Sequence, residues 1–400
     1  MIELLAPAGN FDKLKTAFYY GADACYFAGT QFGLRAYAGN FDNDGLKQSV
    51  DYAHSLNKKA YVTVNIIAHN EDFNNLEEYI KYLNSINVDG VIVADVGIIK
   101  LIREVCPNLD VHVSTQANIT NKYSAKFFCD LGVKRLVLAR ELSVKEIKEI
   151  RDFIPSDVEI EVFVHGAMCI SYSGRCLLSN YLTNRDSNKG ACVQACRWEY
   201  TINEKSRDNE KLPIYEDNRG TYILNSKDLN MLEHLQQLID AGVTSFKIEG
   251  RMKSVYYVAT VVNAYRRAID QLGTKKSVKE LLEELNKTSH RNYTTGFYFG
   301  SNNKECLASS TPVQTHEFMA VVLDENKNGR VLIEQRNRFK VGDVLEVLSP
   351  NSTFNKTIEV TPMESLTGEE VVDALGVQQK LYLKTKLKLT NGDILRKKIN

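Results

Sequence analysis

Short apolar runs alternate with longer amphipathic segments over the first 300 residues. Eight runs rich in apolar and β-branched residues predict strands, at 3–6, 24–27, 60–66, 90–94, 111–114, 135–139, 159–164 and 244–248. Between the runs, apolar residues recur at helical spacing, as at 12–20, 73–86, 144–153 and 252–272. A strand and a helix repeated eight times predict an α/β fold, a (β/α)8 barrel of the TIM type.

The turn after the first strand argues against an open nucleotide-binding sheet. It reads Ala6-Pro-Ala-Gly-Asn10, which lacks the G-x-G-x-x-G spacing, and no Walker A pattern occurs in the chain. The closed barrel is therefore the preferred prediction.

Residues 166–221 interrupt the repeat after the seventh predicted strand, and they are rich in Gly, Ser and Asn. This insertion follows the carboxyl end of a strand, the side of a TIM barrel on which active sites are built. Polar residues at other strand ends are expected on the same side: Asn65, Asp95, Ser114, Thr115, Gln116, Arg140, Glu141, His165 and the run 247–253.

A second module is predicted at 301–400, after a barrel domain at 1–300. The stretch 301–312 is polar and rich in turn residues, and alternating apolar positions follow at 318–323, 330–334, 343–348 and 380–389. These runs predict a small antiparallel β-barrel. Two basic strips lie on it, one of Arg336, Arg338 and Lys340, the other of Lys380, Lys384, Lys386, Lys388, Arg396, Lys397 and Lys398. They form either a solvated outer face or a surface for a phosphate backbone.

Composition predicts a soluble, cytoplasmic protein. The chain is 44% hydrophobic and 25% charged, and it carries 50 basic and 50 acidic residues. Neutral net charge means that any nucleic-acid surface must be local. No apolar run approaches the ~20 residues of a membrane span, and the first residues lack the pattern of a signal peptide.

Four of the eight cysteines, Cys169, Cys176, Cys192 and Cys196, fall within 28 residues, which indicates a metal centre. Their gaps of six, fifteen and three residues favour a [4Fe-4S] cluster over zinc, whose structural sites usually take two closely spaced pairs. Zinc stays an alternative, and two disulfides are a third. Cys25, Cys106, Cys129 and Cys306 are expected to be small buried hydrophobes.

The run Glu161-x-Phe-x-x-Gly-Ala-Met-Cys169-x4-Gly-x-Cys176-x-Leu-Ser179 resembles the signature of the U32 family, long labelled collagenase-like peptidases. The stretches 5–9, 189–197, 224–229, 247–253 and 293–300 also resemble this family. The C-terminal module resembles that of the branch that makes 5-hydroxyuridine in tRNA.

The resemblance implies an iron-sulfur protein that helps to hydroxylate an aromatic ring. In the branch just mentioned, the target is the wobble uridine 34 of tRNA, and prephenate is a required metabolite; other branches act on ribosomal RNA or in ubiquinone synthesis. The ubiquinone-related branch takes its fourth cluster ligand from a cysteine just after the Lys-Asp-Leu run, where this chain has Asn230. The resemblance therefore makes Cys196 the fourth ligand.

Two other classes of function stay open. A peptidase is the first alternative, because the family carries that label. The chain has neither the H-E-x-x-H motif of metalloproteases nor the G-x-S-x-G motif of serine hydrolases. A catalytic pair of Cys169 and His165 would need a thiolate that is already a ligand of the predicted cluster. A non-catalytic binding or assembly factor is the second.

Roles are assigned to the strand-end residues as hypotheses. Arg140, Lys227, Lys247, Arg251 and Lys253 are expected to bind a dicarboxylate such as prephenate. Glu141, Asp228 and Glu249 would act as acid or base, or hold those cations, and His165 would tune the cluster or lie in the core. Tyr172, Tyr181 and Trp198 would stack on a flipped base or pack the insertion. The cluster would transfer electrons, supplied by a partner protein, or bind a substrate oxygen.

Overall fold

The computed structural model describes most of the chain. The described residues are 2–34, 40–169, 171–176, 178–183, 185, 187, 191–195, 227–274, 276–300 and 313–399, with the backbone alone of 215–217 and 220–222. They fall into two compact units, one of Met1–Leu14, Asp23–Met252 and Arg291–Pro312, the other of Lys15–Ala22, Lys253–His290 and Val313–Asn400. The predicted linker at 301–312 lies outside the described residues.

The first unit contains a closed barrel of eight parallel strands. These are β1 (Glu3–Pro7), β2 (Ala24–Phe27), β3 (Lys59–Val64), β4 (Gly90–Val93), β5 (Val111–Val113), β6 (Arg135–Val137), β7 (Glu159–Ala167) and β11 (Ser245–Ile248). Neighbouring strands pair in chain order, and β11 pairs with both β1 and β7, which closes the ring. The predicted (β/α)8 barrel is confirmed.

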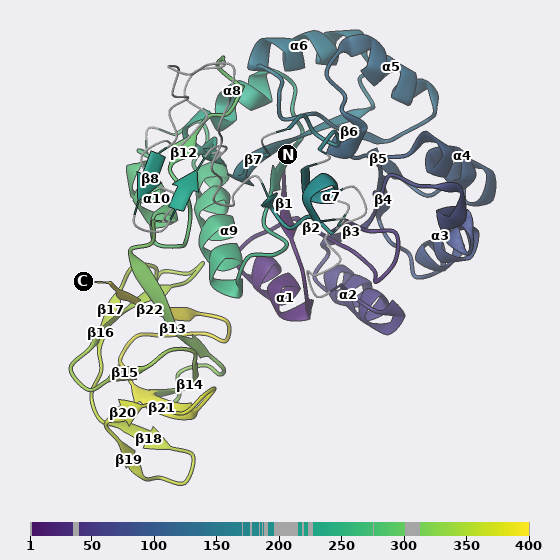
Figure 1. The fold of residues 1–400 in the computed structure, drawn as a ribbon. Helices are drawn as coiled ribbons and strands as arrows, with labels where there is room; N and C mark the ends of the chain where they lie inside the picture. The colour runs from purple at the N-terminus through teal and green to yellow at the C-terminus, as the bar shows by residue number, and fades with distance from the viewer. Residues whose placement is uncertain are drawn as a thin grey trace. The chain divides into compact units, whose positions relative to one another are not determined.

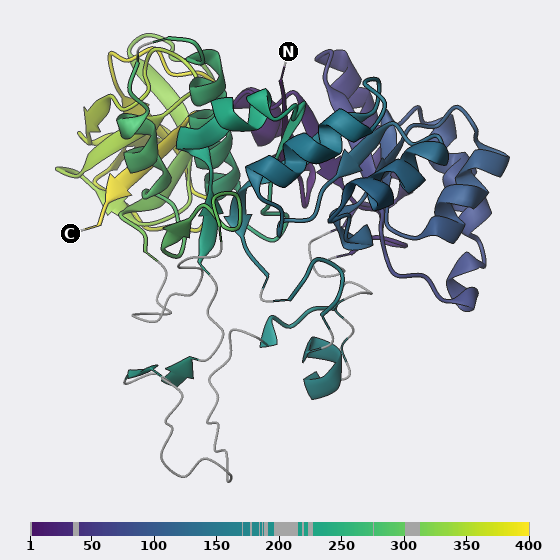
Figure 2. The same cartoon turned by 90° about the horizontal axis from the view of Figure 1, so that it is seen from above.

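Helices follow the strands and lie outside them, as Figure 1 and Figure 2 show for α2 to α6. They are α1 (Phe11–Tyr19), α2 (Asn43–Ser55), α3 (Leu76–Ser85), α4 (Val96–Val105), α5 (Lys122–Asp130), α6 (Val144–Phe153) and the shorter α8 (Leu235–Asp240). Side-chain caps begin several of them. The Asp95 carboxylate accepts hydrogen bonds from Gly97 N at 2.8 Å and Ile98 N at 3.1 Å, so this strand-end residue serves to start α4.

Strand β7 continues past the rim of the barrel. Its last residues, His165 to Ala167, pair antiparallel with β10 (Asp228–Asn230), which in turn pairs with β12 (Tyr293–Thr294). The insertion therefore leaves β7 and returns to the side of the same strand. Within it lie α7 (Leu178–Thr183) and the strand pair β8 (Tyr215–Asp217) and β9 (Gly220–Tyr222).

The second unit joins two helices to an antiparallel sheet. The helices are α9 (Val255–Asp270) and α10 (Lys279–Leu285). The main sheet has the order β17-β16-β22-β13-β14-β21-β18-β19, with bounds Thr357–Glu359, Val344–Leu348, Ile394–Lys398, His316–Val322, Arg330–Gln335, Lys380–Lys384, Met363–Ser365 and Glu370–Val371. Strands β15 (Phe339–Lys340) and β20 (Asp373–Ala374) form a second pair.

This sheet encloses one apolar core. Ile358 near one end of the strand order and Met363 near the other belong to the same buried cluster, with Val331, Leu381 and Leu395. The predicted antiparallel C-terminal module is confirmed. Within the described residues, no helix combines the length and hydrophobicity that a membrane crossing requires.

Candidate active site

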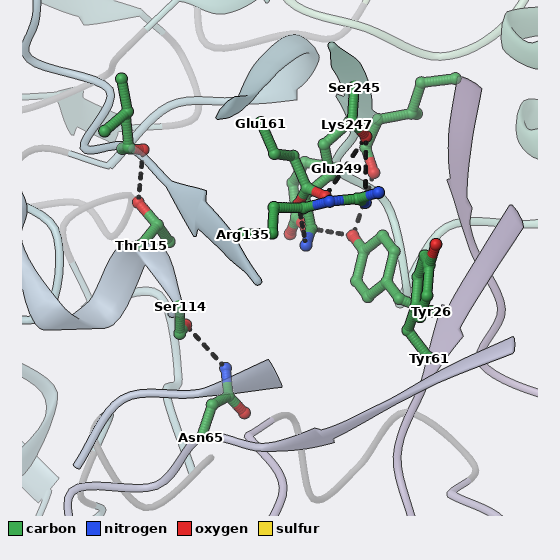
Figure 3. Close-up of polar contacts among 12 residues, drawn as sticks. Tyr26, Tyr61, Asn65, Ser114, Thr115, Arg135, Glu161, Ser245, Lys247 and Glu249 are labelled. Carbon is green, nitrogen blue, oxygen red and sulfur yellow. Dashed lines mark hydrogen bonds and ion pairs between the residues drawn. The ribbon is translucent and has the colours of Figure 1, made fainter. Parts of the chain in front are cut away.

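A network of buried charges fills the end of the barrel at which the strands begin (Figure 3). Arg135, the first residue of β6, lies 2.5 Å from Glu3, 2.6 Å from Glu159 and 2.9 Å from Glu161. Burial alone would lower the pKa of the Arg135 guanidinium, but the carboxylates of Glu3 and Glu161 raise it overall. The Ser245 hydroxyl donates to Glu3 Oε1 at 2.9 Å. This end of the barrel is thus held by ion pairs.

Lys247 carries the network into the middle of the barrel. Its Nζ lies 2.7 Å from Glu161 Oε1 and 4.4 Å from the centroid of the Tyr26 ring. Glu161 is fully buried and the Lys247 side chain is 5% exposed. Burial lowers the pKa of Lys247, and the Glu161 carboxylate offsets part of that shift. The ammonium that was predicted to bind a dicarboxylate is therefore bonded to a carboxylate of the chain itself.

Tyr26 links this interior to the catalytic side of the barrel. Its hydroxyl lies 3.0 Å from Ile248 O and 3.2 Å from Glu249 Oε2, and it can donate to either oxygen. Glu249 follows β11 directly and is half-buried, as expected for a strand-end residue. Tyr26 was not predicted as a site residue; its signal in the sequence was an aromatic ring inside the second apolar run.

Arg251 joins two further parts of this side. Its guanidinium donates to Thr63 Oγ1 at 3.3 Å and to Asn40 Oδ1 at 2.6 Å, and the residue is 3% exposed. Nearby strand ends are also bonded to each other, because Asn65 Nδ2 donates to Ser114 Oγ at 3.4 Å (Figure 3). The polar residues predicted at strand ends thus form a hydrogen-bonded rim.

Two contacts dock the first part of the insertion on this rim. Ser173 donates to the Glu141 carboxylate from its backbone N–H at 3.0 Å and from its hydroxyl at 3.2 Å. Gly174 lies so close to the loop after β5 that an added Cβ would stand 2.2 Å from Gln116 O, and its φ of +76° also favours glycine. The structure therefore places the segment between Cys169 and Cys176 against the barrel.

Arg140 lies beside this segment. One of its terminal nitrogens donates to Ala167 O at 2.6 Å, and its guanidinium carbon is 4.1 Å from the centroid of the Phe163 ring. Within the described part of the chain, its buried Nε has no hydrogen-bond partner. Arg140 therefore keeps a donor for a ligand while its planar group is held by the ring.

Three of the four cysteines predicted as metal ligands lie in the described residues. Cys169 is exposed, whereas Cys176 and Cys192 are half-buried. The backbone N–H of Gln194 donates to Cys192 Sγ at 3.4 Å. Cys196 and Trp198 lie outside the described residues.

The donor chemistry of these thiols fits a soft metal or an iron-sulfur cluster. However, the described residues do not bring three His, Cys, Asp or Glu side chains together as a metal site. The prediction of an iron-sulfur cluster therefore depends on the pattern of cysteines in the sequence. Tyr172 and Tyr181 are 60% and 85% exposed, so neither ring is packed between the insertion and the barrel.

The remaining predicted residues lie near the extension of β7 or in the second unit. His165 is 1% exposed, and its ring centroid is 5.4 Å from that of Tyr293. Asp228 is buried and accepts a hydrogen bond from Arg291 N at 3.0 Å, and Lys227, which precedes it, is half-buried. Lys253 belongs to the second unit, where it donates to Ser289 O at 3.4 Å.

The fold and the cysteine segment define a family. The model described as peptidase family U32 matches residues 9–307, and the model of the peptidase family U32 C-terminal domain matches residues 314–396. The chain belongs to peptidase family U32.

Curated relatives carry three kinds of name. The chain is 42% identical to tRNA hydroxylation protein P1 of Bacillus subtilis (strain 168), over 99% of this chain and 94% of the relative. It is 39% identical to the 23S rRNA 5-hydroxycytidine C2501 synthase of Escherichia coli (strain K12), over 68% of this chain and 40% of that protein. It is 33% identical to a collagenase of Porphyromonas gingivalis (strain ATCC BAA-308 / W83), over 74% of this chain and 73% of that relative.

Proposed function

We propose that this protein is a cytoplasmic tRNA hydroxylase that converts the wobble uridine 34 to 5-hydroxyuridine. The observation that carries the proposal is the full-length similarity to a tRNA hydroxylation protein, 42% over 99% of this chain. A second relative is a 5-hydroxycytidine synthase that acts on ribosomal RNA. The two names share one reaction type, the hydroxylation of RNA.

Cys169, Cys176 and Cys192, with Cys196, would hold a [4Fe-4S] cluster; zinc is the alternative. Such a cluster supplies one-electron transfer, which side chains cannot provide. The docking of Ser173 on Glu141 and of Gly174 on Gln116 supports this assignment, since both contacts hold the segment with the first two thiols on the catalytic side.

The residues of the rim would bind the reactants and move protons. Ring hydroxylation releases a proton from the carbon that is attacked, and Glu249, whose carboxylate accepts a hydrogen bond from Tyr26, would accept it. Arg140 would bind a carboxylate of prephenate or a related dicarboxylate through its unpaired Nε. Lys227, Lys247, Arg251 and Lys253 stay candidates for the same role, and His165 and Asp228 for acid-base work. A partner protein would supply the electrons.

Mass spectrometry of tRNA nucleosides tests the reaction. A strain that lacks the gene should lose 5-hydroxyuridine and its derivatives at the wobble position, and the wild-type gene should restore them. A Glu249→Gln variant, which keeps an acceptor for Tyr26 but cannot take up the proton, should restore little. Unchanged wobble hydroxylation in the deletion strain would end the proposal.

A peptidase is the second candidate, because the family and one relative carry that name. Its most direct nucleophile is Cys169, whose thiol is exposed. His165, the nearest histidine in sequence, is almost fully buried and lies against Tyr293, which disfavours its use as the base of such a thiol. Peptide cleavage that is present in purified wild type and lost in Cys169→Ala would favour this candidate. A non-catalytic assembly factor would show neither activity.

A further inference from the structure

We propose that the outer face of β21 and the segment after it form a docking surface for the phosphodiester backbone of RNA. Lys380, Lys384, Lys386 and Lys388 make up this surface, which we call the β21 lysine face. That the RNA is tRNA rests on the function proposed above. The surface itself rests on charges and contacts within the second unit.

Some basic residues of the C-terminal module form ion pairs with carboxylates of the chain, and others do not. Arg396 is fully buried and lies 2.5 Å from Glu284, so its predicted place in an exposed strip is wrong. On the surface, Arg338 is 2.7 Å from Asp373, Arg336 is 2.7 Å from Glu334 and Lys397 is 2.7 Å from Asp343. These cations are already neutralised by the protein.

The four lysines of the β21 lysine face differ from these residues. All four are exposed, and among the described residues of the chain none of them forms an ion pair within 4.0 Å. An exposed ammonium group that the protein leaves unneutralised is available to a phosphate, and binding it releases condensed counterions from the nucleic acid.

Their alternation places the lysines on one side of the chain. Burial along 380–389 alternates between exposed lysines and more buried residues, with Leu381, Leu383 and Leu389 fully buried in the core. Residues two apart on a strand share a face at a spacing of roughly 7 Å. Lys380 and Lys384 therefore share one face of β21, and the alternation of exposed lysines with more buried residues continues through Lys386 and Lys388 after the strand ends.

The part of the β21 lysine face that lies beyond β21 is held in place by Asn326. Its side-chain nitrogen donates to Thr385 O at 2.8 Å and to Leu387 O at 2.9 Å. Lys386 and Lys388 alternate with these two residues, so the backbone that carries them is fixed. A fixed row of charges loses less conformational entropy on binding than a mobile tail does.

An aromatic ring lies within the β21 lysine face. Tyr382 is half-buried between Lys380 and Lys384 on the same face of β21, and the guanidinium carbon of Arg330 is 4.8 Å from its ring centroid. Arg330 also binds both oxygens of Glu364 at 3.0 Å. Glu364 lies opposite Tyr382 and is paired with Arg330, and Glu334 lies opposite Lys380 and is paired with Arg336, so neither carboxylate neutralises the lysines of the face.

Binding of the full-length protein to total tRNA from the deletion strain tests the inference. The affected variant carries Lys380→Gln, Lys384→Gln, Lys386→Gln and Lys388→Gln. The matched control carries Lys81→Gln, Lys100→Gln, Lys126→Gln and Lys148→Gln, four exposed lysines on barrel helices that each have an acidic partner one turn away. Fluorescence anisotropy at salt concentrations from about 50 to 200 mM gives the dissociation constant and its salt slope.

We expect the first variant to bind tRNA at least about tenfold more weakly and to lose roughly 3–4 units of the slope of log K against log salt, since each of four phosphate contacts contributes about 0.7–0.9. The control should bind like wild type. Equal binding and slope in the two variants would overturn the inference. Because wobble hydroxylation is measured separately, weaker binding combined with intact 5-hydroxyuridine in the deletion strain would support this surface and reject the proposed function. Unchanged tRNA binding by the first variant, together with loss of 5-hydroxyuridine in the deletion strain, would reject this surface and support the proposed function.

Discussion

Lys247 and Glu161 form an ion pair of 2.7 Å inside the barrel, and Glu161 is shared with Arg135 at 2.9 Å on its other oxygen. One buried carboxylate thus serves two cations. The pair is not symmetric, because Glu161 keeps Arg135 when Lys247 is removed, whereas Lys247 forms no second ion pair within 4.0 Å among the described residues.

This asymmetry predicts unequal effects on stability. Glu161→Gln should lower the free energy of unfolding by about 3–5 kcal/mol, since it leaves a buried ammonium without its counter-charge. Lys247→Met should cost less, and the double variant should recover much of the loss. Urea denaturation measures all three, with Lys148→Met on the exposed surface of α6 as the control. Equal losses in the two single variants would contradict the shared-carboxylate arrangement.

Gly174→Ala should undock the cysteine segment. The added Cβ would meet Gln116 O at 2.2 Å in addition to the strain of a φ of +76°. Gly273→Ala is the matched control, because its φ is +74° and nothing lies within 4 Å of the added atom. Limited proteolysis between 169 and 195 should speed up in the first variant only, with a lower iron content after anaerobic purification. Equal protease sensitivity of both variants would show that backbone strain alone matters.

Replacing a cysteine by alanine should remove the metal only where that cysteine is a predicted ligand. Cys192→Ala and Cys196→Ala should bleach an anaerobically purified, brown protein that contains about four irons per chain. Cys25→Ala should keep the colour and the iron, since Cys25 is fully buried in β2 and burial raises the pKa of its thiol. Colourless wild-type protein with one equivalent of zinc would establish the alternative metal.

His316 should make the second unit sensitive to acid. Burial, with a smaller contribution from the Arg396 charge, lowers the pKa of His316 from 6.5 to about 4. Between these values the unfolded chain binds a proton that the folded chain does not, so stability falls as the pH drops. The loss attributable to this group is up to about 2 kcal/mol between pH 7 and pH 5.

A His316→Gln variant should lack this part of the acid sensitivity. Gln cannot be protonated, and it can still accept from Thr315, whose hydroxyl lies 2.9 Å from His316 Nδ1. Thermal unfolding at pH 7 and pH 5 compares the two proteins. A variant that loses as much stability as wild type between pH 7 and pH 5 would place the acid-sensitive group elsewhere.

The barrel could be predicted from sequence because its strands are buried on both faces. Uninterrupted apolar runs such as those of β2 and β4 are typical of parallel strands, and they lie where predicted. Strands β10 and β12 were missed, since they have three and two residues and exist only because β7 runs past the rim. Their pairing depends on tertiary structure and leaves no periodic signal.

The candidate site was predicted less completely. The strand-end rule located Glu249 and Glu141, whose surroundings in the structure are consistent with it. It did not locate Tyr26, Arg135 or Glu161, because these lie inside strands and face inward only once the barrel is closed. Lys247 lies in a motif whose other members were predicted to be catalytic, yet it is the third residue of β11 and bonds Glu161. Which strand residues face inward depends on the register of all eight strands.

The charges inside the barrel also constrain how the sequence can diverge. A change at Arg135 alone would leave Glu3 and Glu161 without their shared cation, and a change at Glu161 alone would leave two cations facing each other. Replacing Arg135 or Glu161 alone therefore gives a protein that folds poorly, whereas replacing both by apolar residues of similar volume does not. Positions 135 and 161 should accordingly change together or not at all among related barrels.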